Sequence, residues 1–225
     1  MRMVVLSLIL VATASAQHFD QTDCQVNETE ATAVFGPPHA APILTSTPYS
    51  ADEVQEHTPA DGASSPTRVV IGHFARDAQG RTRTRESYKW APIRLAEILD
   101  PIKGVAYLLD DQKKIAHRML LAPALATQAP ATEDPRTTVE TLGTQTIEGV
   151  MTQGIRKIFR SSHNLTIETW ESPELKITLL TISSNGYSTM LTNLSRDPDP
   201  ALFLPPPAYT VVDETKPFPM TVQLQ

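Results

Sequence analysis

The chain has 225 residues, and its 19 lysines and arginines against 25 aspartates and glutamates give a net charge of −6 at neutral pH. This charge argues against a general nucleic-acid binder, which needs a basic surface. A composition of 40% hydrophobic and 20% charged residues excludes a membrane-embedded or wholly disordered chain. Proline is frequent (19 residues) and glycine is scarce (9 residues), which favours a β-rich chain with long connections.

Residues 1–16 have the pattern of a secretory signal peptide. Arg2 precedes an apolar run over residues 3–12, which is much shorter than the roughly 20 residues that span a bilayer. Small residues end the segment, and the predicted cut follows Ala16. The alternative is an uncleaved anchor. The sequence therefore predicts a periplasmic or secreted protein with no transmembrane span after cleavage.

Residues 17–66 predict a Pro-rich disordered tail, because they contain no sustained period of 2 or 3.6 and no apolar run longer than three residues. A short helix capped by Ser50 and reaching Glu56 is the alternative for one part of it. Cys24 is the only cysteine, so it cannot form an intrachain disulfide. Its role stays open between a free thiol and a pair with another chain.

From residue 67 to residue 225 the pattern is one of short strands and tight turns. Turn signals occur at Gly80, over residues 100–104 and over residues 184–186. Residues 122–137 predict a flexible loop. Strands are predicted at 68–74, 81–90, 93–99, 105–109, 114–121, 139–142, 146–150, 155–160, 165–171, 176–183, 187–194 and 209–212. Short loops make neighbours antiparallel, so we expect a mainly β fold: an antiparallel meander that forms an open curved sheet or a half-barrel.

Several segments resemble uncharacterised exported proteins of soil bacteria. These segments are Gly80–Arg83, Ile98–Asp110, Leu142–Arg156, Glu168–Lys176 and Asp197–Phe203. More distantly, the strand rhythm and the Trp-Glu-Ser-Pro-Glu sequence in the fourth segment resemble the LolA-like superfamily of periplasmic lipoprotein carriers. That resemblance implies a half-barrel that holds an apolar ligand, and it brings no catalytic motif.

A row of arginines is the sharpest local feature of the strand region. Arg81, Arg83 and Arg85 alternate along one predicted strand and therefore share a face, at intervals of about 7 Å. Such a row could bind a carboxylate, a phosphate or an anionic head group through charge-assisted hydrogen bonds. The alternative is an ordinary solvated face or a sheet edge protected by charge.

Aromatic residues provide the other candidate ligand contacts. Tyr107 and Trp170 could line an apolar ligand site, and packing in the core is the alternative. The six histidines lack the spacing of metal ligands, and no nucleophile elbow, phosphate loop or dinucleotide fingerprint occurs. We therefore expect no metal, no cofactor and no enzymatic activity. The sequence predicts an exported binder of a lipid-like, apolar or amphipathic ligand, or alternatively an interaction or sensor module that binds another protein of the cell envelope.

The predicted cleavage is directly measurable. Protein purified from the culture medium or periplasm of its host should begin at Gln17, so its intact mass should be lower than that of the 225-residue chain by the mass of residues 1–16. A purified protein that retains Arg2 would show that the segment is not removed.

Overall fold

The computed structural model describes residues 24–26, 30–40, 42–59, 65–87, 94–124, 136–160 and 165–223. Strands make up 62% of the structure, and the helical element of the described residues is a single 3-10 turn, η1 (Pro200–Phe203). The chain divides into two compact units. The first unit contains residues 1–48, 75–125 and 198–225, and the second contains residues 49–74 and 126–197.

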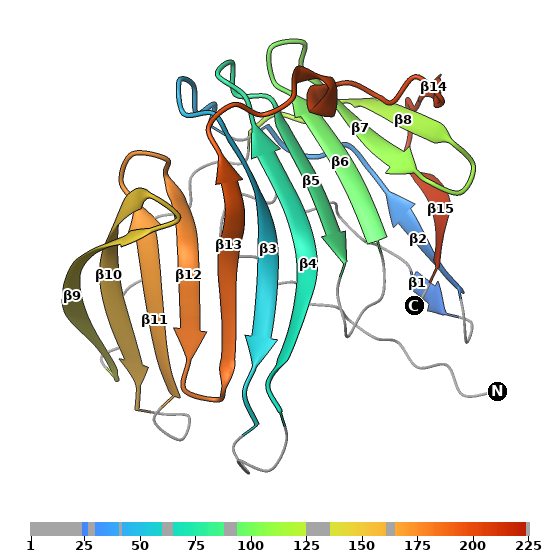
Figure 1. Cartoon of the computed structure of the whole chain (residues 1–225). Coiled ribbons are helices and arrows are strands. Elements are labelled where there is room, and N and C mark those ends of the chain that lie inside the picture. The colour runs from blue at the N-terminus through green and yellow to red at the C-terminus, as the bar shows by residue number, and fades with distance from the viewer. Residues whose placement is uncertain are drawn as a thin grey trace. The chain divides into compact units, whose positions relative to one another are not determined.

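The second unit is a sheet in which the strand order is β4-β3-β13-β12-β11-β10-β9 (Figure 1). Five of its strands follow one another along the chain as an antiparallel meander, and β3 pairs antiparallel with the last of them. The strands are β3 (Tyr49–His57), β4 (Thr67–Arg76, whose last two residues belong to the first unit), β9 (Thr137–Ile147), β10 (Val150–Phe159), β11 (Leu165–Ser172), β12 (Ile177–Ser183) and β13 (Tyr187–Ser195).

The turn between β12 and β13 confirms the hairpin signal in the sequence. Gly186 has φ of +89°, and a Cβ at this position would overlap the carbonyl oxygen of Thr58. Only glycine fits both conditions, since other residues rarely adopt this conformation and the backbone of a neighbouring segment fills the space. The glycine therefore fixes the register in which β13 begins.

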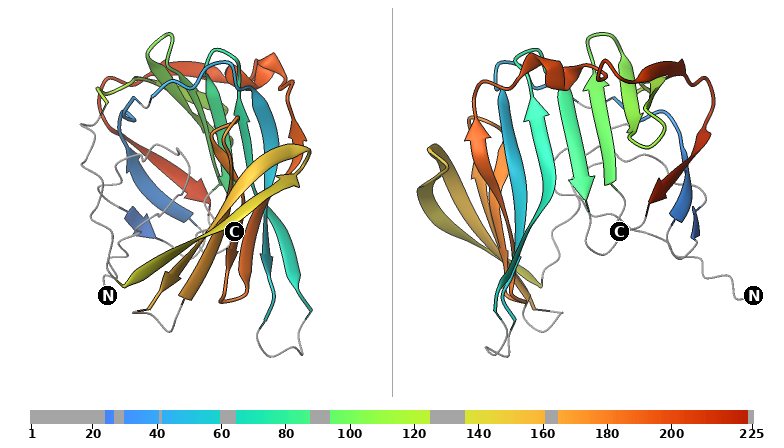
Figure 2. Two further views of the ribbon diagram at one scale, coloured as in Figure 1. Left: turned by 90° about the vertical axis from the view of Figure 1, so that its left-hand side faces the viewer. Right: turned by 45° about the vertical axis from the view of Figure 1, so that its right-hand side comes forward.

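Glycines also shape β9 and β10, although they do not divide this region into three strands as the sequence predicts. The two strands run through Gly143 and Gly154 and turn at Glu148 and Gly149, which both have positive φ. Their register shifts between Gly154 and Ile155, which is the bulge that the glycine pattern predicts. Figure 2 shows that β9 and β10 twist strongly relative to the other strands of this unit.

Apolar side chains on one face of the second unit form its buried cluster. Leu175 and Leu179 are almost fully buried, and Leu175 comes from the turn between β11 and β12. The other buried members of this cluster are Ala51, Val150, Ile177 and Leu191. The cluster packs along the edge where the β9–β10 and β11–β12 turns lie, because three of its members belong to these turns or border them.

The first unit contains two sheets. The larger has the order β14-β8-β7-β6-β5, and the smaller has the order β1-β2-β15 (Figure 2). The strands of the larger sheet are β5 (Thr82–Ser87), β6 (Arg94–Asp100), β7 (Val105–Asp110), β8 (Ile115–Leu120) and β14 (Thr210–Asp213). Those of the smaller sheet are β1 (Cys24–Val26), β2 (Glu30–Phe35) and β15 (Phe218–Gln223).

Each face of the larger sheet of the first unit buries a different cluster. On one face, Leu108 and Met119 pack against Phe35, Phe218 and other residues of the smaller sheet. On the other face, the buried residues are Ala96, Ile98, Leu109 and Ala116, with Tyr107 and Tyr209 packed against them. This sheet is therefore covered on both sides, and its alternating residues divide between the two clusters.

Three strands of the structure, β1, β2 and β3, lie inside the predicted tail of residues 17–66. The predictions of disorder for this part and of a helix after Ser50 are wrong for β2 and β3. In β2, Ala33 and Phe35 are buried, and in β3, Ala51 and Val54 are buried. A strand needs only one or two well-placed apolar residues to bury one face, so the lack of longer apolar runs in this segment does not exclude strands.

The C-terminal strands also differ from the prediction. β14 lies at the sheet edge, as expected for residues 209–212, but it pairs parallel with β8. A parallel return is possible because the chain reaches β14 through a long connection from β13 that includes η1. β15 was not predicted, because Pro219 interrupts its pattern, and a proline is accepted there since β15 is an edge strand.

The predicted fold class is confirmed, since the structure is mainly β, largely antiparallel and open rather than closed into a barrel. Residues 1–16 and most of the predicted loop at 122–137 lie outside the described residues. The signal peptide and the flexible loop therefore stay predictions.

One glycine offers a test of the packing in the second unit. Gly154→Ala should lower the free energy of unfolding by about 1–3 kcal/mol, because its Cβ would lie 2.6 Å from the ring of Trp170. Gly36→Ala is the matched control, since its Cβ would meet only an ordinary contact at 3.8 Å. Urea denaturation measures both variants, and equal stabilities would show that the ring moves away without loss.

Candidate functional site

Four apolar residues form a row across neighbouring strands of the second unit. Val54 of β3 lies opposite Met190 of β13, Met190 opposite Leu180 of β12, and Leu180 opposite Trp170 of β11. Directly opposite residues of antiparallel strands project to the same face, so these four side chains, which we call the apolar row, lie side by side. Trp170 in turn lies opposite Gly154 of β10, where the row ends.

The apolar row is on the face opposite the buried cluster of this unit. Val54 is buried, whereas Met190, Leu180 and Trp170 are half-buried. Ile182 lies two residues beyond Leu180 on the same face and is 39% exposed. None of these residues belongs to a buried apolar cluster among the described residues. The row is therefore an apolar surface that an extended apolar molecule could contact.

Trp170 lies over the backbone of β10. Three carbons of its six-membered ring are 2.6–2.7 Å from the place where a Cβ on Gly154 would be. The missing side chain at residue 154 thus lets the indole ring cross onto the neighbouring strand. This contact fixes the ring at one end of the apolar row, where it adds a large apolar area.

Charged side chains border the row at the Trp170 end. Arg156 of β10 donates from Nε and Nη2 to Oε1 of Glu168 at 2.9 and 2.7 Å, and from Nη1 to Oε2 of Glu140 at 3.2 Å. Glu168 is two residues from Trp170 on the same strand and face. One guanidinium therefore links two carboxylates next to the indole ring.

A second polar group borders the row at the Val54 end. Asp52 of β3 accepts hydrogen bonds from Asn193 Nδ2 at 2.8 Å and from His73 Nδ1 of β4. The hydrogen bond from Asn193 is the main reason that the pKa of the Asp52 carboxyl lies below its ordinary value. Asp52 is two residues from Val54 and shares its face. The carboxylate therefore stays charged beside the row.

The predicted arginine row lies in the first unit, and each of its guanidiniums has a partner. Nε of Arg81 donates to Asp77, and its guanidinium lies 5.5 Å from the ring centre of Phe203. Nη1 of Arg83 donates to the carbonyl oxygen of Leu202 at 3.1 Å. Burial lowers the pKa of this half-buried guanidinium. The prediction that the three arginines share a face agrees with these contacts to the C-terminal segment.

The third arginine belongs to a group that holds the same segment. Nη2 of Arg85 donates to Asp111 Oδ2 at 2.6 Å, and the hydroxyl of Tyr209 donates to the other carboxylate oxygen. We call residues 199–209 the C-terminal strap, because they touch all three arginines directly or through Asp111. Binding of an anionic ligand by these arginines stays a prediction, and such a ligand would compete with the strap.

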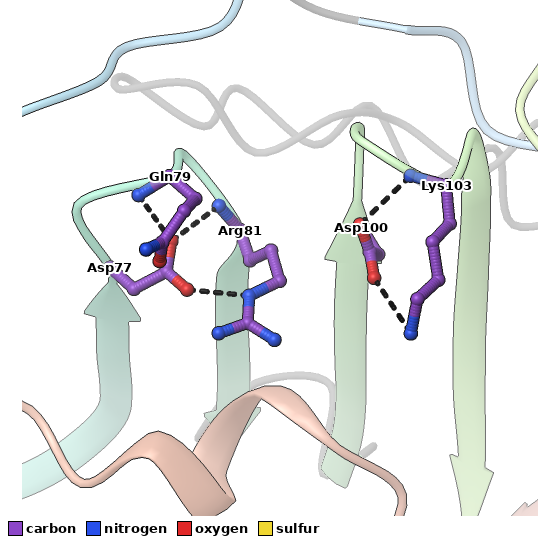
Figure 3. A network of polar contacts seen from close by, with 5 residues as sticks. All are labelled: Asp77, Gln79, Arg81, Asp100 and Lys103. Atoms are coloured by element: carbon purple, nitrogen blue, oxygen red, sulfur yellow. Dashed lines mark hydrogen bonds and ion pairs between the residues drawn. The ribbon is translucent and has the colours of Figure 1, made fainter.

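Buried aspartates fix the turns that surround the arginine row (Figure 3). Oδ1 of Asp77 accepts from the backbone N–H groups of Gln79 and Arg81, and Oδ1 of Asp100 accepts from that of Lys103. Both aspartates are buried, and backbone donors satisfy one oxygen of each carboxylate while the side chains of Arg81 and Lys103 pair with the other. These aspartates end their strands and therefore serve the fold of the hairpins.

The remaining predicted site residues fall in different surroundings. Tyr107 of β7 packs against the buried cluster of the first unit, in agreement with the core alternative. Trp170 belongs to the second unit and is half-buried. Sequence reasoning missed Val54, Met190 and Leu180, because only the register of β3, β13 and β12 shows that they face the same way as Trp170.

Neither a metal-binding cluster nor a membrane-spanning helix occurs in the described residues. No group of three or more His, Cys, Asp and Glu side chains in this part of the chain could hold a metal ion. His73 and His117 each contact a carboxylate instead, Asp52 and Glu214 respectively. The described residues also contain no helix with the length and hydropathy needed to cross a bilayer.

Comparisons with known proteins yield weak likenesses only. No protein-family model and no curated protein matches the chain. An uncharacterized conserved protein from Thermus thermophilus aligns with 75% of this chain and 91% of its own, at 11% identity and a TM-score of 0.40. A putative outer membrane lipoprotein-sorting protein domain from Vibrio parahaemolyticus (66% of this chain, 84% of its own, 10% identity) has a TM-score of 0.21.

A DUF1329 family protein from Desulfovibrio piger aligns with 71% of this chain and 90% of its own, at 10% identity and a TM-score of 0.20. All of these likenesses have low identity and low TM-scores. Likenesses of this size do not assign a function, so the site must be judged by its own chemistry.

The contacts of Arg81, Arg83 and Arg85 predict that replacing these residues lowers the stability of the fold. The triple variant Arg81→Ser, Arg83→Ser, Arg85→Ser should lower the free energy of unfolding by about 2–4 kcal/mol, since the strap loses charged hydrogen bonds. That loss corresponds to a melting temperature lower by about 5–10 °C. Arg68→Ser is the control, because Arg68 is 58% exposed and should change the melting temperature little. An unchanged triple variant would mean that the strap does not depend on the arginines.

The hydroxyl of Tyr209 should lose its proton at a higher pH than that of an ordinary tyrosine. Burial, followed by the hydrogen bond to Asp111, raises its pKa to about 12. Because the folded-state pKa lies above the ordinary value of about 10, the contact stabilises the fold fully below pH 10. This stabilisation is lost as the pH rises toward 12. Ultraviolet titration of the wild type against Tyr209→Phe should show that one high-pKa phenol is missing from the variant, and identical curves would contradict the assignment.

Proposed function

We propose that this protein is exported and binds an apolar or amphipathic, lipid-like ligand along the apolar row of the second unit. The observation that carries the proposal is the in-register alignment of Met190, Leu180 and Trp170 as half-buried apolar side chains on one sheet face. Removing such surface from water is worth roughly 25 cal/mol per Å². An alkyl chain laid across the strands would cover three large side chains at once.

The polar groups beside the row favour an amphipathic ligand over a purely apolar one. Asp52, Glu168 and Arg156 lie within two residues of the row on their strands, so a head group on the ligand would meet hydrogen-bonding partners there. Ligand sites in proteins combine an apolar surface with a few polar groups in this way. Export is supported by the signal-peptide pattern of residues 1–16.

A pair of variants tests which face of the sheet binds the ligand. Leu180→Glu should weaken the binding of N-phenyl-1-naphthylamine, an uncharged fluorescent apolar probe, at least tenfold, because a carboxylate in the row must be desolvated. Thr181→Glu introduces the same group at the next residue, on the opposite face, and should leave binding unchanged. Melting temperatures confirm that both variants fold. Equal effects of the two substitutions, or no binding by the wild type, would refute the proposal.

A second candidate function is the binding of another protein of the cell envelope. It is favoured by β9, an eleven-residue strand at the end of the strand order of the second unit, whose residues are mostly exposed. An edge strand can extend its sheet with a strand from a partner. Native mass spectrometry of protein purified from its host distinguishes the two candidates, since a co-purified lipid supports the first and a co-purified polypeptide the second.

A further inference from the structure

We propose that the ligand of the apolar row is a cationic amphiphile, such as a long-chain amine or quaternary ammonium compound. This inference rests on the proposed function and adds the sign of the head-group charge. It comes from the side chains that border the row, which are predominantly acidic. We call Asp52, Glu56, Glu140 and Glu168 the acidic border.

The acidic border lies close to the apolar row on the same face. Asp52 and Glu56 flank Val54 at two residues before and after it, and Glu168 is two residues before Trp170. Two residues along a strand correspond to about 7 Å. Glu140 joins the border through its hydrogen bond to Arg156. An ammonium group on a ligand that covers the row would therefore lie near at least one carboxylate.

Cations near the row compensate this charge only in part. Arg156 pairs with Glu168 and Glu140, and Arg68 lies 3.4 Å from Glu56. Four carboxylates against two guanidiniums leave two negative charges in excess, apart from His73 beside Asp52. At such distances an excess of this size favours a cation over an anion by roughly tenfold or more. An anionic lipid would experience the same field as repulsion.

The aromatic residue of the row favours the same head group. Trp170 lies at the end of the row and next to Glu168. Indole rings attract ammonium groups through the negative charge of the ring face, and quaternary ammonium ions are bound in this way in other proteins. The carboxylates of Glu168 and Glu140 outnumber the one guanidinium between them, Arg156, so the charge at this end of the row and the indole ring both favour a cation.

Displacement of the uncharged probe by two ligands with the same tail tests the inference. Decyltrimethylammonium should displace N-phenyl-1-naphthylamine from the wild-type protein at a concentration at least tenfold lower than decanoate does. Raising the salt concentration should reduce this ratio, because salt screens exposed charges. Glu168→Gln should reduce the ratio at least threefold.

Glu171→Gln is the matched control. It changes the net charge by the same amount, but Glu171 is exposed and lies opposite Gln153, on the other face from Trp170 and Gly154. It should leave the ratio unchanged. Equal displacement by the two ligands, or stronger displacement by decanoate, overturns the cationic head group while the proposed function stands. Failure of the probe to bind the wild type overturns the proposed function, and with it this inference.

Discussion

The contact between Trp170 and Gly154 is the constraint on which the candidate site depends. The indole ring lies where any side chain at residue 154 would be, so the ring and the bare backbone define each other's position. The register shift after Gly154 then moves the rest of β10 relative to β9. Because the pairing of β11 with β12 places Trp170 opposite Leu180, the ring is aligned with the apolar residues of β12, β13 and β3. A change in this one contact would alter the end of the apolar row.

In the first unit, the charged arginine row binds a segment of the same chain. Its arginine row is covered by the C-terminal strap, through a carbonyl oxygen, an aromatic ring and a carboxylate. Three aligned guanidiniums would repel one another on a bare sheet. The strap covers the arginine side chains, and the groups that it brings to them offset their positive charge. The strap residues Phe203 and Tyr209 pack there as well, Phe203 being buried. A row of like charges on a strand can thus hold a segment of its own chain.

Much of the fold could be predicted from the sequence, because hairpin turns and strand alternation are local. The turns at Gly80, Gly104 and Gly186 all have the positive φ that their sequence patterns imply. The strands β2, β3 and β15 were not predicted, because pairing with distant strands, rather than local pattern, stabilises them, and the three-residue β1 was not predicted either. Of the candidate site, Trp170 could be predicted as a single residue. The other three residues of the row could not, since only the register of their strands brings them beside Trp170.

The position of β3 determines the order in which the second unit can form. β3 pairs with β13, so that Glu53 lies opposite Leu191, more than a hundred residues later in the chain. The hairpins from β9 to β13 need only near neighbours, as does the pairing of β3 with β4, whereas the pairing of β3 with β13 must wait until residue 195 is available. Such a high contact order makes closure of this sheet slow. During synthesis β3 therefore lacks its β13 partner until late, and the apolar row is completed last.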